Sequence, residues 1–115
     1  MDFSIQKDDS YTYIRVLNEK LDYLMAPGLK SELVLIVANG EMNILVDLSG
    51  CNFCDSSGLS ALLLGNRLCR DVNGKFILYG CTGQVSEMLD LADLGNHLTV
   101  AETKDEACSF FTSLH

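Results

Sequence analysis

The chain has 115 residues, of which 16 are acidic and 8 basic, and its formal net charge is −8 at pH 7. This length predicts a single domain over residues 1–115 with a sizeable core, and the negative charge argues against nucleic-acid or anionic-lipid partners. No apolar run approaches the roughly 20 residues of a membrane-spanning helix. The N-terminus carries no signal-like segment, so we expect a cytoplasmic protein with no membrane association.

Two alternating runs near the N-terminus predict a β-hairpin. Phe3 and Ile5 belong to the first run and residues 11–16 to the second, with a turn over residues 7–10 between them. Side chains that alternate between apolar and polar with a period of two residues are typical of half-buried strands.

Helices and strands then alternate along the chain, and several of the helices end at Gly or Asn, which commonly terminate helices. The expected strands cover residues 43–48, 75–79 and 98–100. The first expected helix has Pro27 in its first turn and ends near Asn39, and the second covers residues 57–71. A third helix covers residues 84–92 and stops near Gly95 and Asn96, and the last runs from Thr103 to Phe110 or Phe111. The nearly continuous apolar run over 43–48 indicates a strand buried on both faces. This order predicts an α/β fold: a central mixed, mostly parallel β-sheet with an N-terminal hairpin, four to five strands and four helices.

The cysteines and histidines are the candidate metal ligands and redox groups. They are Cys51, Cys54, Cys69, Cys81, Cys108, His97 and His115. The odd number of cysteines favours reduced thiols, and no second Cys-x-x-Cys or His pair completes a zinc site. We therefore expect no metal and no cofactor.

Three groups of residues are candidates for an enzyme site. Cys51 and Cys54 form a Cys-x-x-Cys pair, but redox pairs of that kind open a helix, whereas further residues here precede the expected helix start. Buried, inert thiols are the favoured interpretation, and a redox enzyme stays an alternative. The loop over 80–83 lacks the spacing and lysine of a P-loop, and a serine hydrolase would need an acid to orient His97. We expect no catalytic residue.

The most informative segment covers residues 55–59, where Ser56 and Ser57 stand between the buried strand and the following helix. Serine hydroxyls at a helix start can accept hydrogen bonds from free backbone N–H groups. A phosphate at the same place would meet those N–H groups and the positive end of the helix dipole. One added phosphate would therefore be tolerated and would change the surface of the domain.

Several segments together match one known family. They are residues 46–49, 53–59 and 62–64, the turn Gly74-Lys75 with the strand over 76–79, the positions Val85, Met88, Leu89 and Leu94, and residues 105–107. In these segments the chain resembles the STAS family, specifically its single-domain anti-sigma factor antagonists. The resemblance covers nearly the whole chain and implies the STAS fold.

The resemblance also implies a partner-switching function. Such proteins bind an anti-sigma factor that is also a serine kinase, and this binding frees a sigma factor. The kinase phosphorylates the serine directly before the glycine, here Ser57, which breaks the complex, and a serine phosphatase restores it. Asp55 and Gly58 match neighbouring motif positions, and we expect a monomer or weak dimer. The alternative is a non-switching STAS scaffold subunit of a transporter or stressosome-like assembly.

A helical wheel separates the two serines. The expected core arc holds Leu59, Leu62, Leu63 and Cys69, and Ser56 projects nearer to this side. The nearly opposite arc holds Ser57, Ala61, Leu64 and Leu68. That second arc either forms a contact surface or packs under a neighbouring element, and the sequence leaves both open.

Two aspartates stand at the ends of strand runs, where ligands gather in α/β sheets. Asp22 would lie beside the serine segment, although a solvated or turn-capping role is the simpler expectation for both Asp22 and Asp47. The expected partner-binding residues are Asp22, Asp55, Ser56, Ser57, Gly58, Ala61, Leu64 and Leu68.

Overall fold

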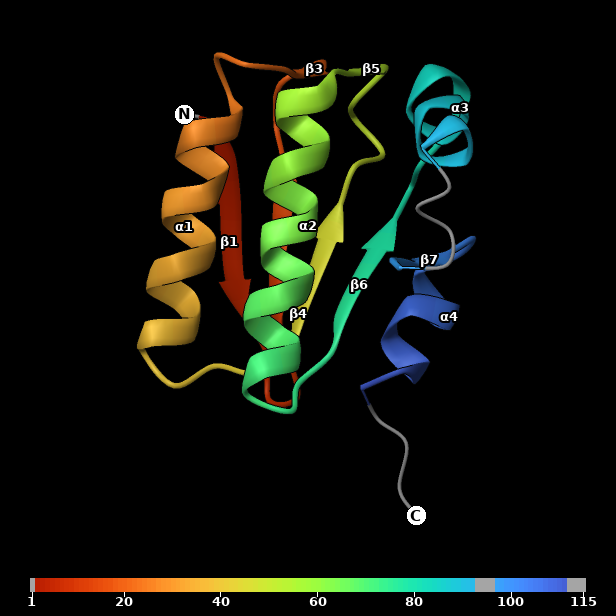
Figure 1. Ribbon diagram of the computed structural model, residues 1–115. Coiled ribbons are helices and arrows are strands. Elements are labelled where there is room, and N and C mark those ends of the chain that lie inside the picture. The colour runs from red at the N-terminus through yellow and green to blue at the C-terminus, as the bar shows by residue number, and fades with distance from the viewer. Residues whose placement is uncertain (1, 93–96, 112–115) are drawn as a thin grey trace.

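A five-stranded sheet forms the centre of the computed structural model, which describes residues 2–92 and 97–111 (Figure 1). The strands stand in the order β1 (Phe3–Lys7), β2 (Thr12–Val16), β4 (Ile44–Asp47), β6 (Phe76–Tyr79) and β7 (Thr99–Ala101). β1 pairs antiparallel with β2, and the pairs β2–β4, β4–β6 and β6–β7 are parallel. The predicted mixed, mostly parallel sheet with an N-terminal hairpin is confirmed.

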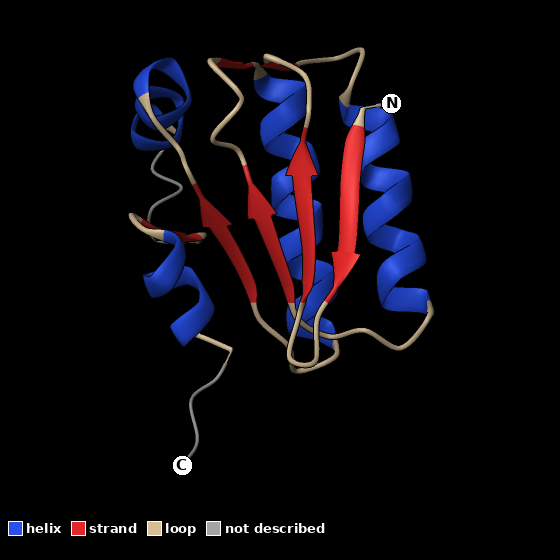
Figure 2. Ribbon diagram, turned by 180° about the vertical axis from the view of Figure 1, so that it is seen from behind, coloured by secondary structure: helices blue, strands red, loops and turns tan. Residues whose placement is uncertain are grey.

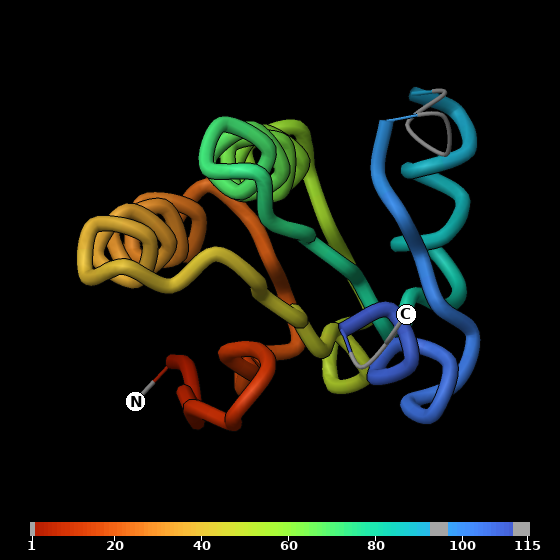
Figure 3. The backbone as a smooth tube through the Cα atoms, turned by 90° about the horizontal axis from the view of Figure 1, so that it is seen from below, coloured from red at the N-terminus to blue at the C-terminus, as the bar shows by residue number. Residues whose placement is uncertain are grey.

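Four helices in the described residues pack around this sheet. They are α1 (Ala26–Ala38), α2 (Ser56–Asp71), α3 (Gly83–Leu91) and α4 (Lys104–Ser109). α1 and α2 run side by side across one face, whereas α4 packs against β6 and β7 on the other face (Figure 3). Figure 2 looks onto that second face, with α1 and α2 behind the strands.

Alternate strand positions supply two separate cores, one on each face of the sheet. Ile14, Val46 and Leu78 are fully buried on the side of α1 and α2. Leu45 packs on the opposite side, in a smaller cluster that includes Ala107 of α4. Because β4 is covered on both faces, all four of its residues are buried, as its apolar run predicted.

A second, two-stranded sheet joins the segments that lead into α1 and α2. β3 (Lys20–Leu21) pairs in parallel with β5 (Phe53–Cys54), with Leu21 opposite Cys54. The sequence did not predict this pair, because strands of two residues show no alternating pattern. The pairing holds the N-terminal ends of the two helices beside each other.

Some element boundaries differ from the expectation. α2 begins at Ser56 rather than Ser57, and α4 ends at Ser109, slightly earlier than expected. The expected helix stop at residues 95 and 96 lies outside the described residues. Across 2–92 and 97–111, no helix combines the length and the apolar character needed to cross a membrane.

Candidate functional site

Asp55, rather than a serine, caps the N-terminus of α2. Its Oδ1 atom accepts a hydrogen bond from the backbone N–H of Gly58 at 2.9 Å, and its Oδ2 atom accepts one from the N–H of Tyr23 at 3.0 Å. A carboxylate is well suited to this position because it also faces the positive end of the helix dipole. The hydroxyls of Ser56 and Ser57 are therefore not needed as caps, and they make no hydrogen bond to any other residue that the structure describes.

The β3–β5 pair brings Asp22 beside this helix start, as expected. The backbone N–H of Asp55 donates to the carbonyl oxygen of Leu21 at 3.3 Å. The Oδ1 atom of Asp22 accepts hydrogen bonds from the N–H groups of Leu24 at 3.1 Å and Met25 at 3.3 Å. Asp22 thus stabilises the turn that enters α1, in agreement with the simpler, turn-capping expectation.

Gly58 permits the close contact between the start of α2 and the β3–β5 pair. A Cβ atom at this position would lie 2.2 Å from the carbonyl oxygen of Leu21 and 2.8 Å from the Sγ atom of Cys54. Both distances are too short for any side chain, and one of the two atoms belongs to the backbone. Glycine is therefore required here for packing.

Gln84, in the first turn of α3, holds β5 from the other side. Its Oε1 atom accepts from the backbone N–H of Cys54 at 2.8 Å, and its Nε2 atom donates to the carbonyl oxygen of Cys54 at 3.1 Å. The side-chain amide of Gln84 thus makes the two backbone hydrogen bonds that a neighbouring strand would make with Cys54, the residue directly before Asp55. Sequence reasoning missed Gln84, since its partner lies 30 positions away and no local pattern marks it.

Ser57 lies at the rim of a shallow depression between the N-terminal ends of α1 and α2. The depression has a volume of about 270 Å³ and is lined by Tyr23, Ala26, Pro27, Lys30, Ser56, Ser57 and Ser60. Ser57 is half-buried, whereas Ser56 is exposed. The expectation that Ser56 leans toward the core is wrong: α2 already includes Ser56, and Ser56 lies nearly opposite the buried arc of Gly58, Leu62 and Cys69.

The predicted contact stripe of α2 is largely covered. Ala61 is 0% exposed, and Leu64 and Leu68 are half-buried, with Leu68 packed against the core. Ala61 is therefore a core residue, and its assignment to the contact surface is corrected. α2 packs on both the sheet and α1, so its buried arc is wider than one stripe. Leu63, expected in the core, is 37% exposed.

The thiols of the Cys-x-x-Cys pair are poorly suited to redox chemistry. Burial raises the pKa of Cys51 to about 11 and the pKa of Cys54 to about 12. Reactive cysteines need a low pKa and some exposure, so this finding weakens the redox alternative. Over the described ranges, no cluster of three or more His, Cys, Asp or Glu side chains is arranged to hold a metal ion.

Asp47 stands apart from the serine segment, on the α4 side of the sheet. Its carboxylate accepts hydrogen bonds from the hydroxyl of Tyr13 and from the N–H of Ser49 at 2.8 Å. Burial of the carboxyl raises its pKa, but the hydrogen bonds from Ser49 and Tyr13 outweigh burial, and the pKa of Asp47 is lowered overall. This aspartate therefore links strands and is no part of the Ser57 site.

The lowered pKa of Asp47 predicts a pH-dependent contribution to stability. A group whose pKa is lower in the folded state stabilises the fold above its unfolded pKa, and this contribution is lost as the pH falls through the folded pKa. Asp47→Asn should lower the free energy of unfolding at pH 7 by about 1–2 kcal/mol, and this difference should shrink below about pH 4. Urea titrations at several pH values measure it; a difference that is constant with pH would contradict the prediction.

The family model for the STAS domain matches residues 3–107. The chain belongs to the STAS domain family. Among curated relatives, it is 28% identical over 86 residues to BtrV of Bordetella bronchiseptica, provisionally named an anti-sigma factor antagonist; the match covers 75% of this chain and 74% of BtrV.

Solved structures of this STAS family share the fold at low sequence identity. An anti-sigma-factor antagonist domain protein of Planctomyces limnophilus superposes with a TM-score of 0.87 at 20% identity, covering 98% of this chain and 100% of that one. The anti-sigma factor antagonist SpoIIAA in its unphosphorylated form gives 0.77 at 21% identity, covering 97% and 99%. SpoIIAA of Bacillus in the phosphorylated form gives 0.72 at 22% identity, covering 94% and 97%.

Proposed function

We propose that this STAS domain is an anti-sigma factor antagonist that is switched by phosphorylation of Ser57. In this proposal the unphosphorylated protein binds an anti-sigma factor that is also a serine kinase, and the phosphorylated protein is released. The observation that carries the proposal is that the hydroxyl of Ser57 is not used as a helix cap. This hydroxyl, at the start of α2, makes no hydrogen bond to another described residue, because Asp55 takes the capping role.

The phosphoryl transfer needs little chemistry from this chain. The Oγ atom of Ser57 attacks the γ-phosphorus of ATP held by the kinase, the bond from that phosphorus to the ADP oxygen breaks, and the hydroxyl proton passes to a base of the kinase. The contribution of this chain is position: Asp55 and Gly58 fix the backbone on both sides of the serine. The proposal therefore makes the protein a binding module and a substrate, and not an enzyme.

The helix start would tolerate the product and change what it presents to a partner. A phosphoserine carries about −1.5 to −2 charges at neutral pH. The free N–H groups at the start of α2 and its helix dipole favour that charge, whereas the carboxylate of Asp55 opposes it. In a complex that covers Ser57, the phosphate would lose its contact with water and would be repelled by any negative charge of the partner. Both effects favour dissociation of the complex.

Mass spectrometry after incubation with a kinase-type anti-sigma factor and ATP tests the proposal. We expect one phosphate per chain, located on Ser57, and none on the Ser57→Ala variant. Ser56→Ala is the matched control, because it removes the adjacent hydroxyl from the same helix turn, and it should be phosphorylated like the wild type. Phosphate on Ser56 instead would overturn Ser57 as the switch residue. No phosphate on the wild type would overturn the switch and favour the non-switching STAS scaffold.

A further inference from the structure

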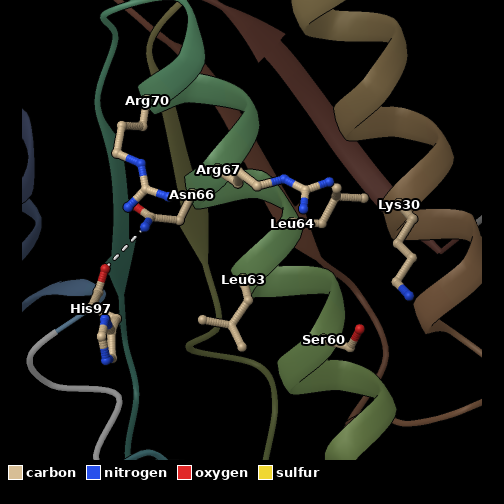
Figure 4. Close-up of a pocket in the computed structure, with 8 residues that line it drawn as sticks. All are labelled: Lys30, Ser60, Leu63, Leu64, Asn66, Arg67, Arg70 and His97. Atoms are coloured by element: carbon tan, nitrogen blue, oxygen red, sulfur yellow. Dashed lines mark hydrogen bonds between the residues drawn. The ribbon is translucent and has the colours of Figure 1, made fainter.

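The exposed side of α2 carries a row of cationic side chains. Arg67 and Arg70 project from its C-terminal half, and His97 borders them from the segment before β7 (Figure 4). Lys30 lies across from α2 on α1, with its amino group directed toward the end of α2 that carries Ser60. These four residues, which we call the cationic groove, line a depression of about 420 Å³. The side-chain amide of Asn66 donates to the carbonyl oxygen of His97 at 3.0 Å, which holds that segment against α2.

The charge of this groove is opposite to that of the chain as a whole. None of the residues that line it is acidic, although the chain has twice as many acidic as basic residues. Among the described residues, one salt bridge forms, between Lys7 and Glu41 at 2.7 Å, and neither of these residues lines the groove. Lys30, Arg67 and Arg70 are thus cations without a carboxylate partner in the described part of the protein.

The groove continues into the depression beside Ser57. Lys30 and Ser60 line both depressions, so one surface leads from the phosphorylation site along α2 to Arg67 and Arg70. Leu63 lies in the middle of this surface and exposes 37% of its area. A surface with charged ends and an apolar centre is suited to a peptide segment.

We propose that the cationic groove binds an acidic segment of the kinase-type anti-sigma factor, and that phosphate on Ser57 weakens this contact by neutralising Lys30. The proposal rests on the proposed function and adds a second contact to it. Arginine forms paired hydrogen bonds with carboxylates, so two or three acidic side chains around one apolar residue would match the groove. A long polyanion such as DNA is disfavoured, because the net charge of −8 repels it.

Phosphorylation of Ser57 would affect the cationic groove because Lys30 lines both depressions. Charges separated by less than the Debye length, about 8 Å at physiological ionic strength, are only partly screened. Lys30 lines the same depression as Ser57, so a phosphate there would compete with the carboxylates of the partner for this lysine. Phosphorylation would then act on the groove as well as on the covered serine.

Charge reversal within the groove tests the inference. We expect Arg67→Glu to raise the Kd for the kinase-type anti-sigma factor at least tenfold, and to raise the KM of Ser57 phosphorylation while kcat changes less than about twofold. The affinity of the wild type should fall with added salt, and this dependence should be weaker in the variant. Arg67 is exposed, so the circular dichroism spectrum and melting temperature should stay unchanged.

Arg15→Glu is the matched control, since it makes the same substitution at an exposed residue of β2 without removing the Lys7–Glu41 salt bridge. An equal loss of affinity in both variants, or none in Arg67→Glu, would overturn the groove as a specific contact. Binding of a DNA duplex by the wild type, lost in Arg67→Glu while the kinase still binds, would also overturn it. A wild type that neither binds the kinase nor becomes phosphorylated would instead refute the proposed function.

Discussion

Gly58→Ala should lower the free energy of unfolding by about 3 kcal/mol, at the upper end of what overpacking substitutions cost. The added Cβ atom would stand 2.2 Å from the carbonyl oxygen of Leu21 and 2.8 Å from the Sγ atom of Cys54. The backbone of β3 cannot turn away as a flexible side chain does. Alanine is favoured over glycine in a helix by about 1 kcal/mol, so the loss must arise from this contact.

Urea denaturation measures the effect, and Ser60→Ala serves as its control. Ser60 is exposed two residues further along α2, so alanine there should leave stability unchanged or slightly higher. A Gly58→Ala variant as stable as the wild type would show that the start of α2 can move away from β3. Such movement would displace Asp55 and Ser57, and the variant should then be a poorer substrate for the kinase.

The sheet and helices were predictable because their signals are local. The alternation in β2 and the continuous apolar run in β4 depend on residues within one strand, and both patterns gave the correct element. The β3–β5 pair was missed because its geometry depends on two segments that are more than 30 positions apart. Local patterns cannot report a contact that the tertiary fold creates.

The sequence placed Ser57 correctly at a helix start, but it did not identify the residue that caps this helix. The cap of this helix is Asp55. The sequence could not identify it, because Asp55, Ser56 and Ser57 follow one another and each is a common capping residue. The helical wheel groups Ser57 with Ala61, Leu64 and Leu68 from their spacing alone, and this spacing does not show that α1 packs on that side of α2. The exposed surface of α2 is therefore the adjacent arc, which carries Arg67 in place of an apolar stripe.

Ser57→Asp should weaken binding to the kinase-type anti-sigma factor by about 100-fold, which corresponds to roughly 2.7 kcal/mol. The introduced carboxylate would lie near that of Asp55 and beside Lys30, in a depression that the partner covers in the proposed complex. In the proposed complex the new carboxylate would also meet the acidic segment of the partner, and like charges brought together in an interface cost several kcal/mol. A phosphate carries more charge than aspartate, so the phosphorylated wild type should bind more weakly still.

Ser57→Asn separates charge from shape in this test. Asparagine has nearly the volume of aspartate and no charge, so its complex should keep an affinity within a few-fold of that of Ser57→Ala. Isothermal titration calorimetry of the three variants against the same partner gives the comparison. Equal affinity of the aspartate and alanine variants would refute an electrostatic switch at Ser57. An equally large loss in the asparagine variant would mean that the partner excludes any larger side chain, so that steric fit rather than charge would release the phosphorylated protein.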